Sequence, residues 1–224
     1  MKKNKIILSI IAVILFLTIA IIIKFNYNRS IEQSSTEMYK GLPVNVSRAT
    51  YMYDTSTPEQ AVGISDYVFV AKINEISRTE YRNPTTVETG LFSSEIRTTP
   101  YTFYNIDVIK NIKGELITSE SIEYMQYGGI NEDGKSYTFI EGTELLEPGK
   151  YYIIMADTFG ENGGEINVTE PNRRILLEDV KNDEDVDNSE KVKRYEEAYR
   201  NEVIPENFDN WERYTSKYDV NYDI

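Results

Sequence analysis

The sequence predicts a mainly β protein, a small antiparallel barrel or sandwich with an N-terminal transmembrane helix and a C-terminal helical segment. Short apolar or alternating stretches separated by Gly- and Pro-containing turns predict the strands. An uncharged apolar run near the start predicts the membrane span, and apolar residues at helical spacing predict the C-terminal helices. The predicted divisions are 1–5 as a cytoplasmic tail, 6–23 as a transmembrane signal anchor, 24–56 as a stalk, 57–178 as the β-barrel domain, 179–187 as an acidic linker and 188–224 as the helical C-terminal segment.

The apolar run at residues 6–23 contains no charged residue. A helix of this length spans about 27 Å, close to the hydrocarbon thickness of a bilayer. A cleavable signal peptide is the alternative, but its apolar region is usually shorter and ends at small residues. Three lysines and the amino terminus precede the run, against Lys24 and Arg29 after it. We therefore expect a single-pass protein of the cell membrane with its N-terminus in the cytoplasm and its bulk outside.

The composition excludes several classes of function. The chain carries 24 Lys and Arg against 37 Asp and Glu, and it has neither cysteine nor histidine. Such an acidic chain repels phosphate polymers, so we expect no nucleic-acid partner. Without cysteine or histidine it has no disulfide, no His-activated nucleophile and no ordinary zinc site. We predict no catalytic, cofactor-binding or metal-binding residue, although an enzyme that uses paired carboxylates stays open.

Turn signals divide residues 57–178 into one short helix and a series of strands. Thr57, Pro58 and Gln60 have the pattern of a helix start. The predicted strands are 67–76, 101–109, 121–127, 136–140, 151–156, 165–169 and 174–177. The sequence Glu147-Pro148-Gly149-Lys150 predicts a type II turn. The apolar phase of these strands predicts core positions at Val68, Val70, Ile106, Val108, Ile153 and Met155.

Residues 78–100 interrupt this succession of short predicted strands and turns. The stretch is rich in Thr, Ser and Glu and contains Asn83-Pro84. We interpret it as an exposed loop. Because long loops on compact domains often carry function, it is also our first candidate for a contact surface.

The acidic linker contains Asp183, Asp185 and Asp187 at alternate positions, as at the start of an EF-hand loop. Arg194 stands where that loop has its bidentate glutamate, which favours a solvated linker over a Ca²⁺ site. Asp187 and Glu190 have the spacing of a capping box.

Two helices are predicted beyond the linker. Val192, Tyr195, Tyr199 and Val203 fall at helical spacing, and a second stripe follows Pro205 at Phe208, Trp211, Tyr214 and Tyr218. We expect both stripes to pack on the barrel or on each other. The alternative is an aromatic face for a partner.

Several segments together resemble one family. They are residues 59–72 (EQAVGISDYVFVAK), 101–108 (YTFYNIDV) with 112–114 (IKG), 126–129 (QYGG) and 147–152 (EPGKYY). They are similar to uncharacterised membrane-anchored extracytoplasmic proteins of Gram-positive bacteria, whose domain resembles the OB-like barrel of tissue inhibitors of metalloproteases. The resemblance implies an OB-like barrel over roughly 57–178. Those inhibitors act through an N-terminal cysteine that this chain lacks, so inhibition is not implied and no functional residue is carried over.

These observations favour a non-catalytic, membrane-anchored binding protein of the cell envelope. Its partners would be the membrane, through residues 6–23, and an unknown protein or envelope component. The alternatives are an enzyme that acts on cell-wall polysaccharide through paired carboxylates and an immunity-type partner of a neighbouring membrane protein.

Overall fold

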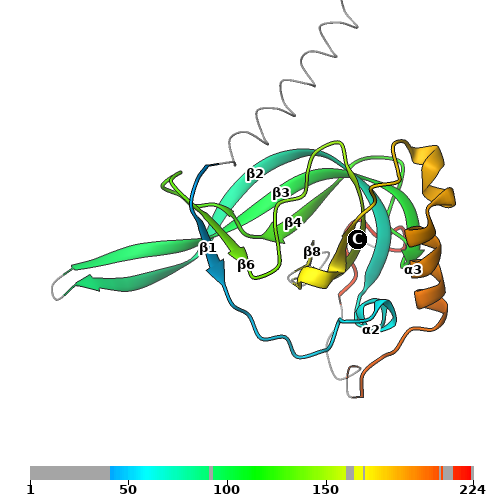
Figure 1. Ribbon diagram of the computed structural model, residues 1–224, viewed down its shortest axis with the longest axis horizontal. Coiled ribbons are helices and arrows are strands. Elements are labelled where there is room, and N and C mark those ends of the chain that lie inside the picture. Colours follow the sequence, from blue (N-terminus) through cyan, green and yellow to red (C-terminus); the bar gives the residue numbers. More distant parts are fainter. Residues whose placement is uncertain are drawn as a thin grey trace, which may run out of the picture. The chain divides into compact units, whose positions relative to one another are not determined.

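The computed structural model describes residues 41–90, 93–159, 164–168, 170–206, 208 and 214–222. This part is mainly β, as predicted, with few helices (Figure 1). Its elements are β1 (Val44–Ser47), α2 (Pro58–Gly63), β2 (Tyr67–Gly90), β3 (Ser93–Lys113), β4 (Ile122–Tyr127), β5 (Gly129–Ile130), β6 (Tyr137–Ile140), β7 (Tyr151–Phe159), β8 (Glu165–Val168), the 3₁₀ turn η1 (Pro171–Arg173), β9 (Arg174–Leu176), the 3₁₀ turn η2 (Asp183–Asn188) and α3 (Glu190–Arg200). The described helices include none with the length and apolar character of a membrane span, and the predicted anchor at residues 6–23 lies outside the described residues.

Five strands pair into a closed ring. Strand β2 pairs with β3, β3 with β4, β4 with β8, β8 with β7, and β7 returns to β2. Strand β9 extends the sheet beside β7, while β1, β6 and β5 form a separate small sheet. Every predicted strand therefore has a counterpart. Three of the pairings, however, join strands that are far apart in the sequence, namely β2 with β7, β4 with β8 and β1 with β6.

The expectation of an antiparallel sheet is wrong at two pairings. Strand β4 runs parallel to β8, and β1 runs parallel to β6. The prediction used side-chain alternation, which identifies a strand but not the direction of its neighbour. The pairing of β1 also corrects the predicted stalk, because Val44–Ser47 belong to a sheet.

The ring encloses one apolar core and carries a second on its outside. The interior core contains Tyr104, Ile106 and Val108 of β3, which share one strand face as predicted. Val68 and Val70 of β2 instead point outward, under the helices. All six predicted core residues are buried, namely Val68, Val70, Ile106, Val108, Ile153 and Met155.

Helices α2 and α3 cover the outer core. Thr57 caps α2 as predicted, with its hydroxyl accepting from the Gln60 N–H at 3.3 Å. The predicted linker folds into η2, and Ser189 caps α3 in place of the expected pairing of Asp187 with Glu190.

The apolar stripe of α3 is only partly as predicted. Val192 and Tyr195 are buried, but Tyr199 and Val203 are exposed and Ala198 takes the third buried position. Residues three and four positions after Tyr195 both lie close to its face of the helix. The sequence alone therefore does not distinguish Ala198 from Tyr199 as the next buried residue.

Of the predicted second helix, the described residues retain helical structure only at Phe208, which lies in a 3₁₀ turn with its N–H bonded to the Pro205 carbonyl at 3.1 Å. Tyr214 lies in irregular structure and Tyr218 in a turn, while Phe208 is buried and packs edge-on against Tyr53. Trp211 lies outside the described residues. The segment is fixed to the ring by Tyr67, whose hydroxyl bonds Asp219 at 2.9 Å and accepts from the Ser216 N–H.

Candidate functional site: the arm and its base

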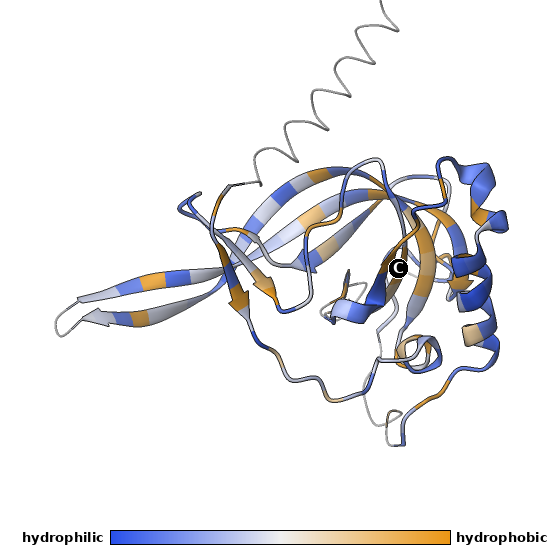
Figure 2. Ribbon diagram, viewed as in Figure 1, coloured by the Kyte–Doolittle hydropathy of each residue, from blue (hydrophilic) through white to orange (hydrophobic). Residues whose placement is uncertain are grey.

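The predicted loop at residues 78–100 is instead an antiparallel ribbon. Its strands pair from Arg78 opposite Phe103 to Gly90 opposite Ser93, and we call residues 79–90 and 93–101 the arm. The arm projects beyond the rest of the ring, with hydrophilic and hydrophobic residues alternating along it (Figures 1 and 2). The loop interpretation failed because a register shift at Asn83-Pro84 breaks the alternation in β2, and Asn83 has a φ of 53°.

The base of the arm carries a network of charged side chains. Arg78, Glu80 and Arg82 lie on one face of β2, as the strand period of two requires. Arg82 binds Glu165 of β8 with both guanidinium nitrogens, at 2.7 and 2.8 Å, and binds Glu80 at 2.6 Å. Arg78 makes the matching pairs, to Glu123 of β4 and to Glu80 at 2.8 Å. Two arginines thus connect β2 to β4 and β8.

Apolar side chains form the floor beneath these charges. Phe103 of β3 and Met125 of β4 are buried and lie opposite each other in register. The Arg78 guanidinium is 3.8 Å from the Phe103 ring centroid, and that of Arg82 is 5.2 Å away. Cations at these distances are attracted to the ring face, so the ring contributes to the placement of both arginines. We call Arg78, Glu80, Arg82, Phe103, Glu123, Met125 and Glu165 the arm-base face.

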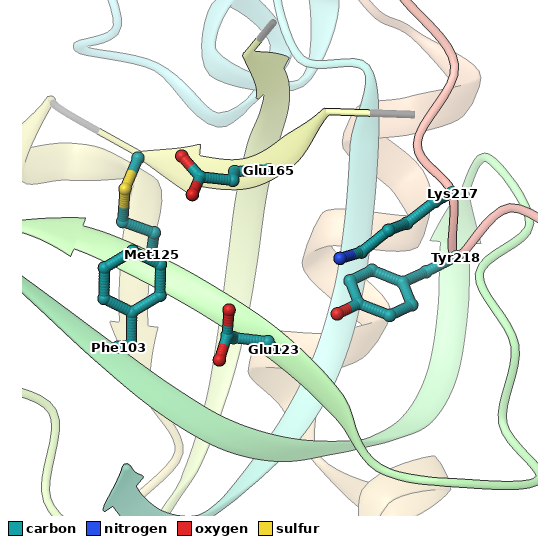
Figure 3. Close-up of a pocket in the computed structure, with 6 residues that line it drawn as sticks. All are labelled: Phe103, Glu123, Met125, Glu165, Lys217 and Tyr218. Carbon is teal, nitrogen blue, oxygen red and sulfur yellow. The ribbon is translucent and has the colours of Figure 1, made fainter. Parts of the chain in front are cut away.

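A small pocket opens beside this face. Figure 3 shows Lys217 and Tyr218, from the C-terminal segment, on one side and Phe103 and Met125 on the other, with Glu123 and Glu165 between them. Its enclosed volume is about 10 Å³. A single water needs about that much space, whereas pockets that enclose a small molecule are far larger. This one is therefore a shallow surface feature with room for about one water and not for a metabolite.

The network lowers the pKa of one carboxyl group and raises the pKa of both guanidinium groups. Hydrogen bonds from Arg82, then from Arg78, lower the pKa of Glu80. The pKa values of the two guanidinium groups rise, that of Arg78 chiefly through Glu123 and that of Arg82 chiefly through Glu165. Each ion pair therefore favours the charged forms at neutral pH.

The pocket brings together one carboxylate pair, Glu123 and Glu165, of the kind that the enzyme hypothesis requires. Both carboxylates are bound by arginine through two guanidinium nitrogens. Glycoside hydrolysis needs one carboxyl group as a proton donor and the other free to attack or to activate water. Oxygens occupied by guanidinium groups are poorly placed for either task.

The acidic residues of the predicted linker have protein partners. Asp183 accepts from the Tyr151 hydroxyl at 2.8 Å, Asp185 from the Lys181 N–H, and Asp187 pairs with Lys110. Burial, and then the bond to Asp183, raise the pKa of Tyr151 to about 12. Within the described ranges, no group of three or more Asp and Glu side chains is arranged to hold a metal ion.

Sequence reasoning missed the arginines and glutamates of the arm-base face. Their signal was the alternation Arg78-Thr-Glu80-Tyr-Arg82, which places three charges on one strand face. The partners Glu123 and Glu165 carried no such signal, because only the ring brings β4 and β8 beneath the arm.

No protein-family model matches the sequence, and no curated protein matches it.

Proposed function

We propose that this chain is a non-catalytic binding protein of a bacterial cell envelope, anchored in the cell membrane by residues 6–23 with its bulk outside. The uncharged run and the lysines before it support the anchor. Its partner is a protein or another envelope component. The net charge of −13 argues against nucleic acid.

The closed ring is, in this proposal, an OB-like barrel, as the resemblance to the metalloprotease-inhibitor domain implies. Support comes from the five-strand closure, in which β2 pairs with both β3 and β7. OB barrels bind ligands on the face of their second and third strands and on the adjoining loops. Here those strands are β3 and β4, and the arm takes the place of the loop between the first and second strands.

The arm-base face carries the binding proposal. Helices α2 and α3 pack over Val68 and Val70 near the start of β2 and over β7, whereas the arm-base face begins further along β2, at Arg78, and runs across β3 and β4 to β8. Its guanidinium and carboxylate groups are held in fixed positions over a buried aromatic floor. Preorganised groups lose little conformational entropy on binding. Because both signs of charge are present, the face suits a protein surface that also carries both.

Photo-crosslinking from intact cells tests this function. A photoreactive residue at Lys217, beside the pocket, should capture one discrete partner, whereas one at the exposed Lys193 of α3 should not. Replacing Arg82 by Ala should weaken the captured band, because the arm-base face loses its link to Glu165. Equal capture from both positions, or none from Lys217, would contradict the proposal.

Protease added to wall-stripped cells should also remove the chain beyond Lys24, while a secreted form beginning after Ala20 would contradict the anchor.

The enzyme alternative rests on the shared pocket of Glu123 and Glu165. It predicts release of reducing ends from purified cell-wall polysaccharide and loss of that release in Glu165→Gln. The binding proposal predicts that neither the wild type nor the Glu165→Gln variant releases reducing ends. An immunity-type role is the special case in which the protein captured at Lys217 is a membrane protein encoded beside this one.

A further inference from the structure

The two edges of the arm differ in a way that points to strand pairing. Strand β2 shifts register against β3 at four places from Ile73 onward, and it contains Pro84, which has no N–H to donate. Bulges and proline are devices that protect an edge strand from pairing with another chain. Strand β3 pairs without a shift over residues 94–97 and has no proline there. The β2 edge is protected and the β3 edge is not.

The β3 edge is open over a defined length. Strand β4 pairs only with residues 102–106 of β3, and the N–H of Gly128 reaches the carbonyl of Pro100. Among the described residues, no strand pairs with the outer side of residues 94–98. At the inner limit of this edge, the Thr98 hydroxyl donates to Glu132 at 2.9 Å. Five residues are therefore available to an added strand.

This edge is complementary to itself. In an antiparallel pair centred on Ile96, Glu95 of each copy faces Arg97 of the other, and Ser94 faces Thr98. Opposite charges and hydroxyl pairs directly across strands are favourable. Ile96, which is 73% exposed, would face its own symmetry mate. A two-fold contact requires such a self-complementary surface.

Charge also favours the arm as the place where two copies meet. The chain carries a net charge of −13, so whole copies repel each other. Residues 78–101 contain three arginines and three glutamates and are neutral. We propose that two copies of this chain associate by antiparallel pairing of residues 94–98 about a two-fold axis at Ile96. This inference does not depend on the proposed function, because it uses the arm edge and not the arm-base face.

Because the chain has no cysteine, an introduced one reports contact directly. The full chain with Ile96→Cys, in detergent, should form a disulfide-linked dimer, since directly opposed residues lie within disulfide range. Thr86, which lies opposite Ile96 on β2, is the matched control. Thr86→Cys should give little dimer, because β3 lies between Thr86 and the two-fold axis in each copy. The two introduced cysteines are then too far apart for a disulfide. Equal dimer from both positions would overturn the proposal.

Charge reversal tests the register. In the Ile96→Cys background, Arg97→Glu places four glutamates together across the axis, and Glu95→Arg places four arginines there. Each variant alone should form little dimer, whereas a mixture of the two should form at least about fivefold more heterodimer. The internal pair of Glu95 with Arg97 is broken in both variants, so only contact between copies explains a rescue. Thermal melting of each variant checks that it folds. Absence of rescue between folded variants would overturn pairing between copies. So would a crosslink, formed by an added cysteine-reactive probe, only to a protein of another size.

Discussion

Arg78 lies over the ring of Phe103, its cross-strand partner, with the guanidinium carbon 3.8 Å from the ring centroid. The same arginine binds Glu123 on the next strand. One side chain thus joins β2, β3 and β4 where the arm leaves the ring. The contacts of Arg78 therefore link the base of the arm to two neighbouring strands of the ring.

Replacing Arg78 by Lys should loosen the arm although the charge is kept. Lysine cannot bind Glu123 through two nitrogens or stack flat on Phe103. Since the Arg78 side chain is 42% exposed, we expect a loss of only about 1 kcal/mol in the free energy of unfolding. Chemical denaturation measures it, and faster amide exchange in residues 79–90 reports the loosening. Arg48→Lys, at a well-exposed pair, is the control and should change neither quantity.

The arm base should become less stable in acid. Arginine hydrogen bonds lower the folded-state pKa of Glu80, so its stabilising effect is fully present above its unfolded pKa of about 4.3. The effect is lost as the pH falls through the lower folded-state value. Glu80→Gln should therefore melt below the wild type at pH 7, and the difference should shrink towards pH 3. A constant difference across this range would show that Glu80 acts through packing alone.

Ile106→Ala should destabilise the protein by about 2–5 kcal/mol, because Ile106 is completely buried in the interior core and the smaller side chain leaves a cavity. Urea unfolding followed by tyrosine fluorescence measures the change. Val46→Ala provides the comparison, since Val46 on β1 is 59% exposed and should cost little. Similar losses at the two positions would mean that the ring interior is not the main core.

Deleting residues 188–224 should destabilise the ring or make it aggregate. The deletion uncovers the outer core that Val192, Tyr195 and Ala198 cover, and it removes the partners of Tyr67. The free energy lost scales with the apolar area exposed. Melting and light scattering compare the truncated and full chains, with Lys193→Ala as a folded control. Unchanged melting would identify the segment as a separate module.

Local sequence determined the elements and much of the core. Thr57 and Pro58 start α2, and Gly149, with a φ of 82°, completes the turn predicted at Glu147. The alternation of β3 correctly placed Ile106 and Val108 inside. These features depend on residues close together in the sequence, so their cause is visible there.

Only the tertiary structure decided which strands meet, in which direction, and what lies at the base of the arm. Local alternation is the same for a parallel and an antiparallel neighbour, so the pairing of β4 with β8 was not predictable from either strand. The arm was not predicted because Asn83 and Pro84 interrupt the side-chain alternation of β2, as a loop would. The strand is recognisable only from its pairing with β3 on both sides of this interruption. Arg82 finds Glu165 only because ring closure brings β8 beneath the arm, since an ion pair between residues 83 positions apart leaves no local pattern in the sequence.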